Sequence, residues 1–139
     1  MNFCDDIRHE VGKKISLIGV YGADLNVPVV PAMIPKLCIF IQLCSDVGQR
    51  FDEDIELRVL VDDTVISTAT QQSGSKESST KNPSSFHKIT SQIIMSPFLI
   101  EKESTLRVRA FYKGVEYKAA ALRIRAQSAS SSEPVELAR

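Results

Sequence analysis

Four residues near the start of the chain, Asp5, Asp6, His9 and Glu10, form its one cluster of side chains that could bind a metal or transfer protons. Carboxylates and imidazoles perform both kinds of chemistry when several of them converge on one point. The surrounding sequence predicts a β-strand, on which Asp5 and His9 face one side and Asp6 and Glu10 face the other, with Arg8. One extended strand cannot bring its two sides together. We therefore expect a charged edge strand, and a small metal-dependent hydrolase built on this cluster is an alternative function.

The three cysteines, Cys4, Cys38 and Cys44, have spacings that match neither a zinc site nor a thioredoxin-type motif. His9 and His87 are the only imidazoles that could activate a thiol, and no nucleophile elbow of the form G-x-S-x-G is present. The six glycines are scattered singly, so none of them builds a phosphate-binding loop. We expect reduced thiols, with Cys38 and Cys44 as small core residues. We predict no catalytic residue, no metal and no cofactor.

Basic residues alternate along both strands of an expected C-terminal hairpin, and Phe111 shares a face with two of them. This basic ribbon consists of Arg107, Arg109, Lys113, Lys118, Arg123 and Arg125. Such a ribbon can follow phosphates while a base stacks on the aromatic ring, so nucleic acid is one candidate partner. The formal net charge of the chain is zero, whereas nucleic-acid-binding domains are usually strongly basic. A solvated sheet face and a surface on which another protein docks are therefore the favoured interpretations.

The zero net charge hides an uneven distribution along the chain. Residues 1–70 contain six Lys and Arg against eleven Asp and Glu, whereas residues 71–139 contain eleven against six. Many of the acids flank one expected strand, at Asp52, Glu53, Asp54, Glu56, Asp62 and Asp63. We interpret them as turn residues, because Asp side chains bond to the backbone of tight turns. Weak self-association of this acidic segment with the basic ribbon of a second molecule is an alternative, although salt screens such contacts.

Apolar residues recur at every second position in two segments, which indicates half-buried strands. Residues 55–62 place Ile55, Leu57, Val59 and Val61 on one side, and residues 105–112 repeat this alternation. Lys113 and Gly114 then form a tight turn, so residues 105–126 should be one long hairpin. The apolar phase of its return strand shifts near residues 119–121, which predicts a β-bulge at the alanine run.

Residues 15–21 and 37–43 are apolar at successive positions, and we expect both to be central strands that are covered on two sides. A hairpin from residue 4 onwards, turning at Gly12, should lead into the first of them. Residues 86–95 supply a further strand, ended by Pro97.

The segment between the two central strands contains Pro28, Pro31 and Pro35, which cannot donate hydrogen bonds to a sheet. We expect an extended connection or an edge crossing there. Many strands and no convincing helix predict an all-β fold, an antiparallel two-layer β-sandwich of seven or eight strands. A small β-barrel is the alternative.

The chain has the length and composition of a single domain, with 139 residues, 43% hydrophobic and 24% charged. We expect residues 1–126 to form that domain, with a mobile serine-rich loop at residues 71–85 and a disordered tail at residues 127–139. No apolar run approaches the roughly 18 residues that a membrane helix needs, and no secretory signal opens the sequence. We therefore expect a cytoplasmic protein without membrane contact.

The first 45 residues contain a recognisable pattern, in the segments FCDDIRHEVGKKISLIGVYG and IPKLCIFIQL. This pattern resembles a family of small uncharacterised bacterial proteins, in which a start like CDDIR-x-E is followed by a Gly-Lys turn and SLIGVY. The sequence departs from the pattern at Lys13, where a second glycine is expected. The resemblance implies no activity, cofactor or catalytic residue. With no catalytic constellation in the sequence, we expect a non-enzymatic module that binds another protein, and the metal-dependent hydrolase and nucleic-acid binding are the alternatives.

Overall fold

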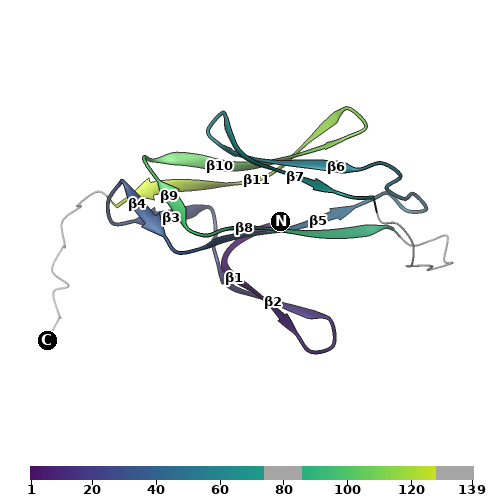
Figure 1. Cartoon of the computed structure of the whole chain (residues 1–139), viewed down its shortest axis with the longest axis horizontal. Coiled ribbons are helices and arrows are strands. Elements are labelled where there is room, and N and C mark those ends of the chain that lie inside the picture. Colours follow the sequence, from purple (N-terminus) through teal and green to yellow (C-terminus); the bar gives the residue numbers. More distant parts are fainter. Residues whose placement is uncertain (74–85, 128–139) are drawn as a thin grey trace, which may run out of the picture.

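The computed structural model describes residues 1–73 and 86–127, in which the chain forms eleven strands and no helix. The strands are β1 Asn2–Glu10, β2 Lys14–Val20, β3 Asp24–Val27, β4 Ala32–Ile34, β5 Leu37–Cys44, β6 Ile55–Val61, β7 Thr64–Gln71, β8 Lys88–Met95, β9 Phe98–Ile100, β10 Ser104–Tyr112 and β11 Val115–Ala126. Sheet A has the order β2-β1-β5-β8, sheet B has the order β3-β11-β10-β6-β7, and β4 pairs with β9. Sheets A and B form two layers (Figure 1). The predicted β-sandwich is confirmed, with more strands than the seven or eight expected.

The main core lies between the two sheets and is built from the strands whose alternation the sequence shows. Ile55, Leu57 and Val59 of β6 and Leu106 and Val108 of β10 are each at most 1% exposed. β5 supplies the opposite layer, between β1 and β8, and its first five residues are buried. The prediction that residues 37–43 form a central strand is therefore confirmed.

The long C-terminal hairpin is also confirmed. β10 and β11 are joined by Lys113 and Gly114, which have φ angles of 48° and 75°. Positive φ at both central residues gives the turn a twist that matches the twist of the flanking strands. Further along, the register shifts so that Ala119 and Ala120 face the single residue Val108. This is the β-bulge that the alanine run predicts.

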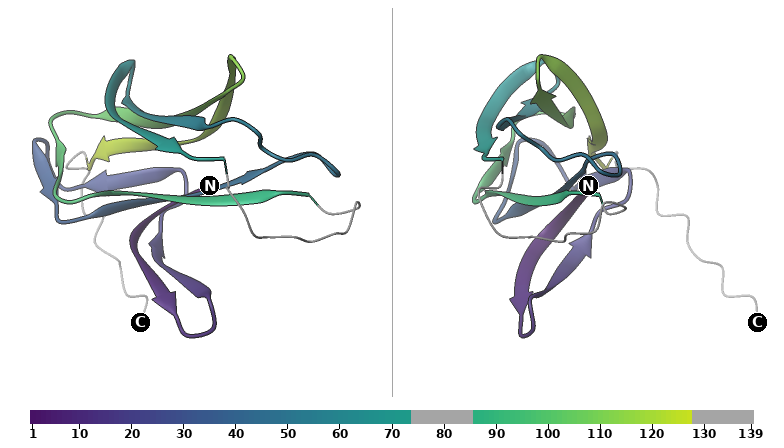
Figure 2. Two further views of the ribbon diagram at one scale, coloured as in Figure 1. Left: turned by 45° about the vertical axis from the view of Figure 1, so that its right-hand side comes forward. Right: turned by 90° about the vertical axis from the view of Figure 1, so that its right-hand side faces the viewer.

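β1 pairs with β5 only over its first residues. Asn2, Phe3 and Cys4 pair with β5, and the remainder of β1 pairs with β2 alone. The β1–β2 hairpin therefore projects from the sandwich (Figures 1 and 2). On β2, Ile18 is 39% exposed and Val20 is 52% exposed. The prediction that residues 15–21 form a central, doubly covered strand is wrong, because β2 is an edge strand on this projection.

The turn of the projecting hairpin places Gly12 and Lys13 at φ angles of 79° and 60°. Both angles lie in the left-handed region, which glycine adopts without the steric cost that a side chain incurs. Lys13 is the position at which the resemblance led us to expect a second glycine, and its backbone has the conformation that glycine favours.

A second, smaller core lies at the base of the projecting hairpin. It joins Cys4 and Ile7 of β1 to Cys38 and Phe40 of β5, with Leu17 of β2 packed against them. The neighbouring residues of β5 belong to the main core instead. β5 is thus apolar at successive positions because its two faces contribute to two different cores.

Two of the cysteine predictions have opposite outcomes. Cys38 is fully buried in the small core, as expected, whereas Cys44, at the end of the same strand, is exposed. The prediction that Cys44 is a core residue is wrong. The two residues share a face of β5, but the small core includes only the first of them.

The proline-rich segment contains two short strands as well as the expected connection. β3 pairs with β11 in parallel, and β4 pairs with β9 in antiparallel orientation. The sandwich is therefore not purely antiparallel. Strands of three or four residues are too short to display an alternation of apolar and polar side chains, which explains why the sequence does not reveal them.

The domain boundaries predicted from composition are only partly covered by the structure. Gln71, which we expected to open the serine-rich loop, is the last residue of β7. Residues 74–85 of the predicted loop and residues 128–139 of the predicted tail lie outside the described residues.

Candidate functional site

Asp5 and Asp6 bond to different partners. The Tyr21 hydroxyl donates a 2.5 Å hydrogen bond to the Asp5 carboxylate, and Lys36 Nζ donates a 2.5 Å hydrogen bond to Asp6. Burial, together with the Asp5 hydrogen bond, raises the pKa of Tyr21 to about 12. The hydrogen bond from Lys36 holds the pKa of Asp6 below its ordinary value. These two carboxylates therefore fasten β1 to neighbouring segments and are not directed at a shared point.

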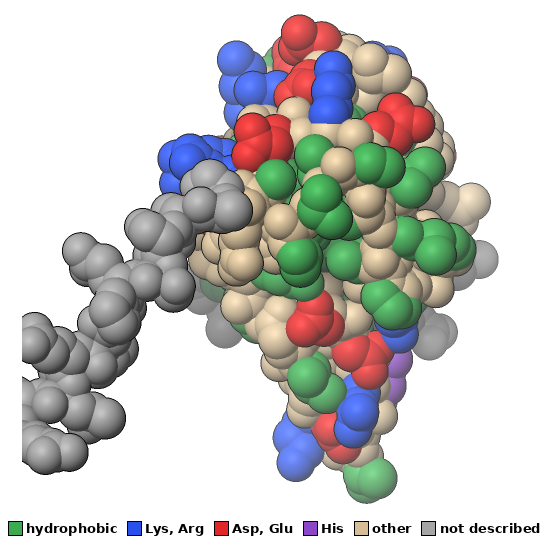
Figure 3. Space-filling view, turned by 90° about the vertical axis from the view of Figure 1, so that its left-hand side faces the viewer, with side chains coloured by type: hydrophobic (Ala, Val, Ile, Leu, Met, Phe, Trp, Pro, Cys, Tyr) green, Lys and Arg blue, Asp and Glu red, His purple; other side chains and the backbone are tan. Residues whose placement is uncertain are grey.

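The other two residues of this cluster lie further along the projecting hairpin. His9 Nε2 is 3.3 Å from Nε2 of Gln92 on β8, and Glu10 is exposed. Acidic and basic side chains are mixed on this projection (Figure 3). Within residues 1–73 and 86–127, no group of three or more His, Cys, Asp or Glu is placed to hold a metal ion. The hydrolase alternative thus has no assembled ligand set in the described part of the chain.

The basic ribbon divides into three parts, of which the first lies at the hairpin turn. Lys113 Nζ is 2.8 Å from the Asp52 carboxylate, which also accepts a 2.6 Å hydrogen bond from the Tyr112 hydroxyl. These two donors lower the pKa of Asp52 to about 2, the lysine having the larger effect. Lys113 is therefore held in an ion pair with the acidic segment.

The second part lies at the opposite end of the hairpin, beside the parallel strand β3. Arg123 Nε is 2.7 Å from the Asp24 carboxylate, and Arg125 Nε is 3.6 Å from the same oxygen. Asp24 belongs to the acidic half of the chain. At both ends of the basic ribbon, an acid from residues 1–70 thus pairs with a basic residue of the C-terminal hairpin, Asp52 with Lys113 and Asp24 with Arg123.

The third part is a row of cations that crosses the middle of sheet B. Arg109 of β10 is the register partner of Arg58 on β6 and of Lys118 on β11. Like charges at directly opposite positions on adjacent strands repel each other. We refer to Arg58, Arg107, Arg109 and Lys118 together as the cationic face.

Two carboxylates partly compensate the cationic face. Glu56 forms an ion pair with Arg58, and Glu116 Oε1 lies 3.3 Å from Arg109 Nε. Within the residues that the structure describes, the side chain of Lys118 forms no ion pair and no hydrogen bond. The row of three cations therefore has two acidic partners, and the Lys118 side chain is the one left without an ion pair.

The aromatic residue of the ribbon is already in contact with one of these cations. The guanidinium carbon of Arg58 lies 4.2 Å from the centroid of the Phe111 ring. This is a cation–π contact, and it covers one face of the ring. The sequence-based interpretation that a nucleic-acid base could stack on Phe111 loses support, because a base would have to displace Arg58 or use the other face.

The cationic face lines a surface groove of about 590 Å³. At one end of the groove, Arg107 Nη1 donates a 3.0 Å hydrogen bond to the backbone carbonyl of Asp62. The Arg109 side chain is only 17% exposed, so neighbouring side chains fix its position. The groove thus presents two guanidinium groups whose placement is set before any partner arrives.

The acidic segment has two roles in the structure. Asp62, at the β6–β7 turn, has a φ angle of 52°, and its carboxylate accepts a 2.9 Å hydrogen bond from the backbone of Thr105. The position of Asp62 in the turn is as predicted, but its carboxylate bonds to the neighbouring strand β10 and not to the backbone of its own turn. Asp52 and Glu56, by contrast, pair with basic side chains of the same molecule. Self-association through these acids would require those contacts to break.

The comparisons with known proteins extend the resemblance that the first 45 residues show. A model described as a family of unknown function (DUF6941) matches residues 1–125. The chain belongs to the DUF6941 family. No curated protein and no solved structure matches it. The inference of an uncharacterised family is therefore confirmed, and the family match reaches into β11, well beyond the segment on which we based it.

The sequence analysis of this DUF6941 chain did not include Arg58 among the candidate binding residues. Arg58 occupies an outward position of β6, as Arg107 and Arg109 do on β10, and this alternation is visible in the sequence. What the sequence does not show is that β6 and β10 are neighbours with Arg58 opposite Arg109. In the described part of the DUF6941 chain, no helix is long and apolar enough to cross a membrane.

Proposed function

We propose that this DUF6941 chain is a non-enzymatic protein-binding or accessory module of the bacterial cytoplasm, and that its cationic face docks an acidic segment of a partner protein. The observation that supports the proposal is the row formed by Arg58, Arg109 and Lys118, which has only two acidic partners. A carboxylate of a partner placed beside Lys118 would complete this row. The three unpaired cysteines suit a reducing compartment.

Electrostatics favours an acidic protein segment over nucleic acid as the occupant. Charge complementarity raises association rates and selects among partners, even where each exposed ion pair contributes only about 0–1 kcal/mol. The zero net charge of the whole chain gives a phosphate backbone no long-range attraction, and the carboxylates that flank the groove repel its phosphates. A protein segment can instead place a few carboxylates at the cationic face and avoid the surrounding acids.

The test is affinity capture from the native bacterium with three baits. The first bait is the wild type, the second combines Arg107→Glu with Lys118→Glu, and the third combines Lys14→Glu with Lys88→Glu. The third bait is a matched control, because it makes the same change of charge at exposed residues of β2 and β8. Circular dichroism should show that all three baits are folded.

We expect one protein partner to be captured by the wild type and the control bait, and to be lost with the second bait. With the purified partner, the affinity of the second bait should fall at least tenfold, which corresponds to about 1.4 kcal/mol. The affinity of the wild type should decrease as salt concentration rises. A partner that binds the second bait as well as the wild type contradicts the proposal. Capture of nucleic acid that is lost with the second bait would replace it with the nucleic-acid alternative.

A further inference from the structure

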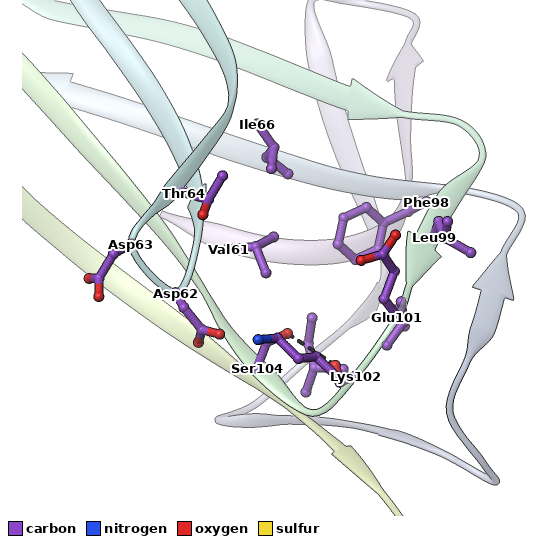
Figure 4. A pocket seen from close by; sticks show the side chains of 12 residues that line it. Val61, Asp62, Asp63, Thr64, Ile66, Phe98, Leu99, Glu101, Lys102 and Ser104 are labelled. Carbon is purple, nitrogen blue, oxygen red and sulfur yellow. Dashed lines mark hydrogen bonds between the residues drawn. The ribbon is translucent and has the colours of Figure 1, made fainter.

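A second cavity, which adjoins the groove of the cationic face at Asp62 and Asp63, opens into the sandwich between the β6–β7 turn and β9 (Figure 4). Its volume is about 640 Å³, which lies within the range of small-molecule sites. The lining includes Phe98, Ile100 and Ile124, which are 5%, 2% and 2% exposed and belong to the main core. A molecule in this cavity would therefore contact the core of the sandwich as well as its surface.

Large apolar side chains also lie at the opening of this cavity. Ile66 of β7 is 44% exposed and Leu99 of β9 is 57% exposed, and both line the cavity. Water at these side chains is unfavourable by about 25 cal/mol for each Å² of apolar surface. An occupant with an apolar body would cover them, whereas a wholly polar occupant would gain nothing from this part of the lining.

The charged groups of the lining indicate the sign of the occupant. The Asp62 carboxylate is bonded to the backbone of Thr105, and the Asp63 carboxylate points away from the cavity in Figure 4. Glu101 instead lines the cavity together with Phe98. Within the described residues, Glu101 has no ion pair and no hydrogen bond. A carboxylate and an aromatic ring in the lining of one cavity are complementary to a cation.

We propose that this cavity binds an amphiphilic amine, a small molecule with an apolar chain or ring and a primary ammonium group at one end. The apolar part lies against Phe98, Ile100 and Ile124, and the ammonium group lies at Glu101. Lys102 is the one basic residue in the lining, and its positive charge repels the ammonium group of the ligand. The site does not depend on the proposed docking of an acidic partner, because the two surfaces select ligands of opposite charge.

The test compares n-octylamine, n-octanol and n-octanoate, which share one chain and differ in the charge of the head group. Each is titrated into the full-length protein below the concentration at which it aggregates, and binding is followed by calorimetry and by amide chemical shifts. We expect the amine to bind at least fivefold more tightly than the alcohol, and the alcohol more tightly than the carboxylate. The shifts should map to β9 and the β6–β7 turn, and the heat capacity change should be negative, as burial of apolar surface requires.

Two charge variants should move the amine affinity in opposite directions. Glu101→Gln should weaken octylamine binding at least fivefold and leave octanol binding unchanged, whereas Lys102→Gln should strengthen octylamine binding. Glu53→Gln is the matched control, because it removes an exposed carboxylate outside the cavity, and it should change neither affinity. Ile66→Trp, which fills the opening, should weaken binding of both the amine and the alcohol.

Three results would overturn the proposal. One is equal affinity for the three ligands, which would indicate an apolar site without selection for charge. Another is octylamine binding that is unaffected by Glu101→Gln in a folded protein. The third is the absence of heat and of chemical shift changes with every ligand at millimolar concentration.

Discussion

Cys4 of β1 lies directly opposite Cys38 of β5, and both side chains are completely buried in the small core at the base of the projecting hairpin. Burial raises the pKa of both thiols, so the reactive thiolate is scarce and inaccessible. Cys44 is exposed. We predict that a thiol reagent such as Ellman's reagent modifies one thiol rapidly in the native protein and all three after unfolding.

The variant Cys44→Ser distinguishes rapid modification of the exposed Cys44 from modification of the buried thiols after slow opening of the fold. It should lack the rapid phase of modification and keep the two thiols that react only on unfolding. If Cys44→Ser still reacts rapidly under native conditions, the small core at the base of the hairpin does not protect its cysteines, and the packing described for β1 is wrong.

Gly19 allows the Asp5 side chain to lie across β2, and we predict that Gly19→Ala destabilises the protein by about 2 kcal/mol or more. A Cβ at residue 19 would be 2.7 Å from Cγ of Asp5, and the residue has a φ angle of 64°. Gly22→Ala is the matched control, because nothing lies within 4 Å of its Cβ position. Urea unfolding should show a change within about 0.5 kcal/mol for Gly22→Ala. Equal stability of the two variants would contradict the close approach of Asp5 to Gly19.

The ion pair at the hairpin turn predicts a pH dependence at the acidic end. The pKa of Asp52 is lowered from 3.8 to about 2, so its contribution to stability is complete above pH 4 and is lost as the pH falls through about 2. Carboxyl-carbon NMR should give a titration midpoint near 2 for Asp52 in the wild type. In Lys113→Gln the midpoint should rise toward the ordinary value, because Lys113 is the main cause of the shift. An unchanged midpoint in that variant would contradict the contact.

Tyr21 predicts a pH dependence at the alkaline end. Its pKa is raised from 10 to about 12, so the contribution of the phenol to stability is present below pH 10 and is lost as the pH rises through about 12. At about pH 11 the chemical shift of the Tyr21 ring carbon should still be that of a protonated phenol. Asp5→Asn should lower the pKa without restoring the ordinary value, because burial is the larger cause. Tyr21→Phe identifies the resonance by its loss.

Much of the sandwich follows from local patterns in the sequence. The alternation in β6 and β10 places Leu57 and Val108 in the core, and Lys113 with Gly114 closes the hairpin where the sequence predicts a turn. Even the β-bulge at residues 119–120 is visible as a change of apolar phase. These features depend on the side-chain period of a strand and on turn conformations, both of which are properties of a few consecutive residues.

The sequence by itself determined the longer strands β5, β6 and β10, their inward faces and the long hairpin, but the tertiary structure decided which strands are neighbours and which surfaces remain open. β1 separates from β5 after Cys4, so the apolar residues of β2 are exposed on a projection although their pattern is that of a central strand. The position of β6 beside β10 places Arg58 opposite Arg109 and thereby creates the cationic face. The physical reason is that apolar periodicity records only whether a side chain is buried. The choice of strand neighbours depends on contacts between residues far apart in the chain, and these contacts form together when the two layers pack.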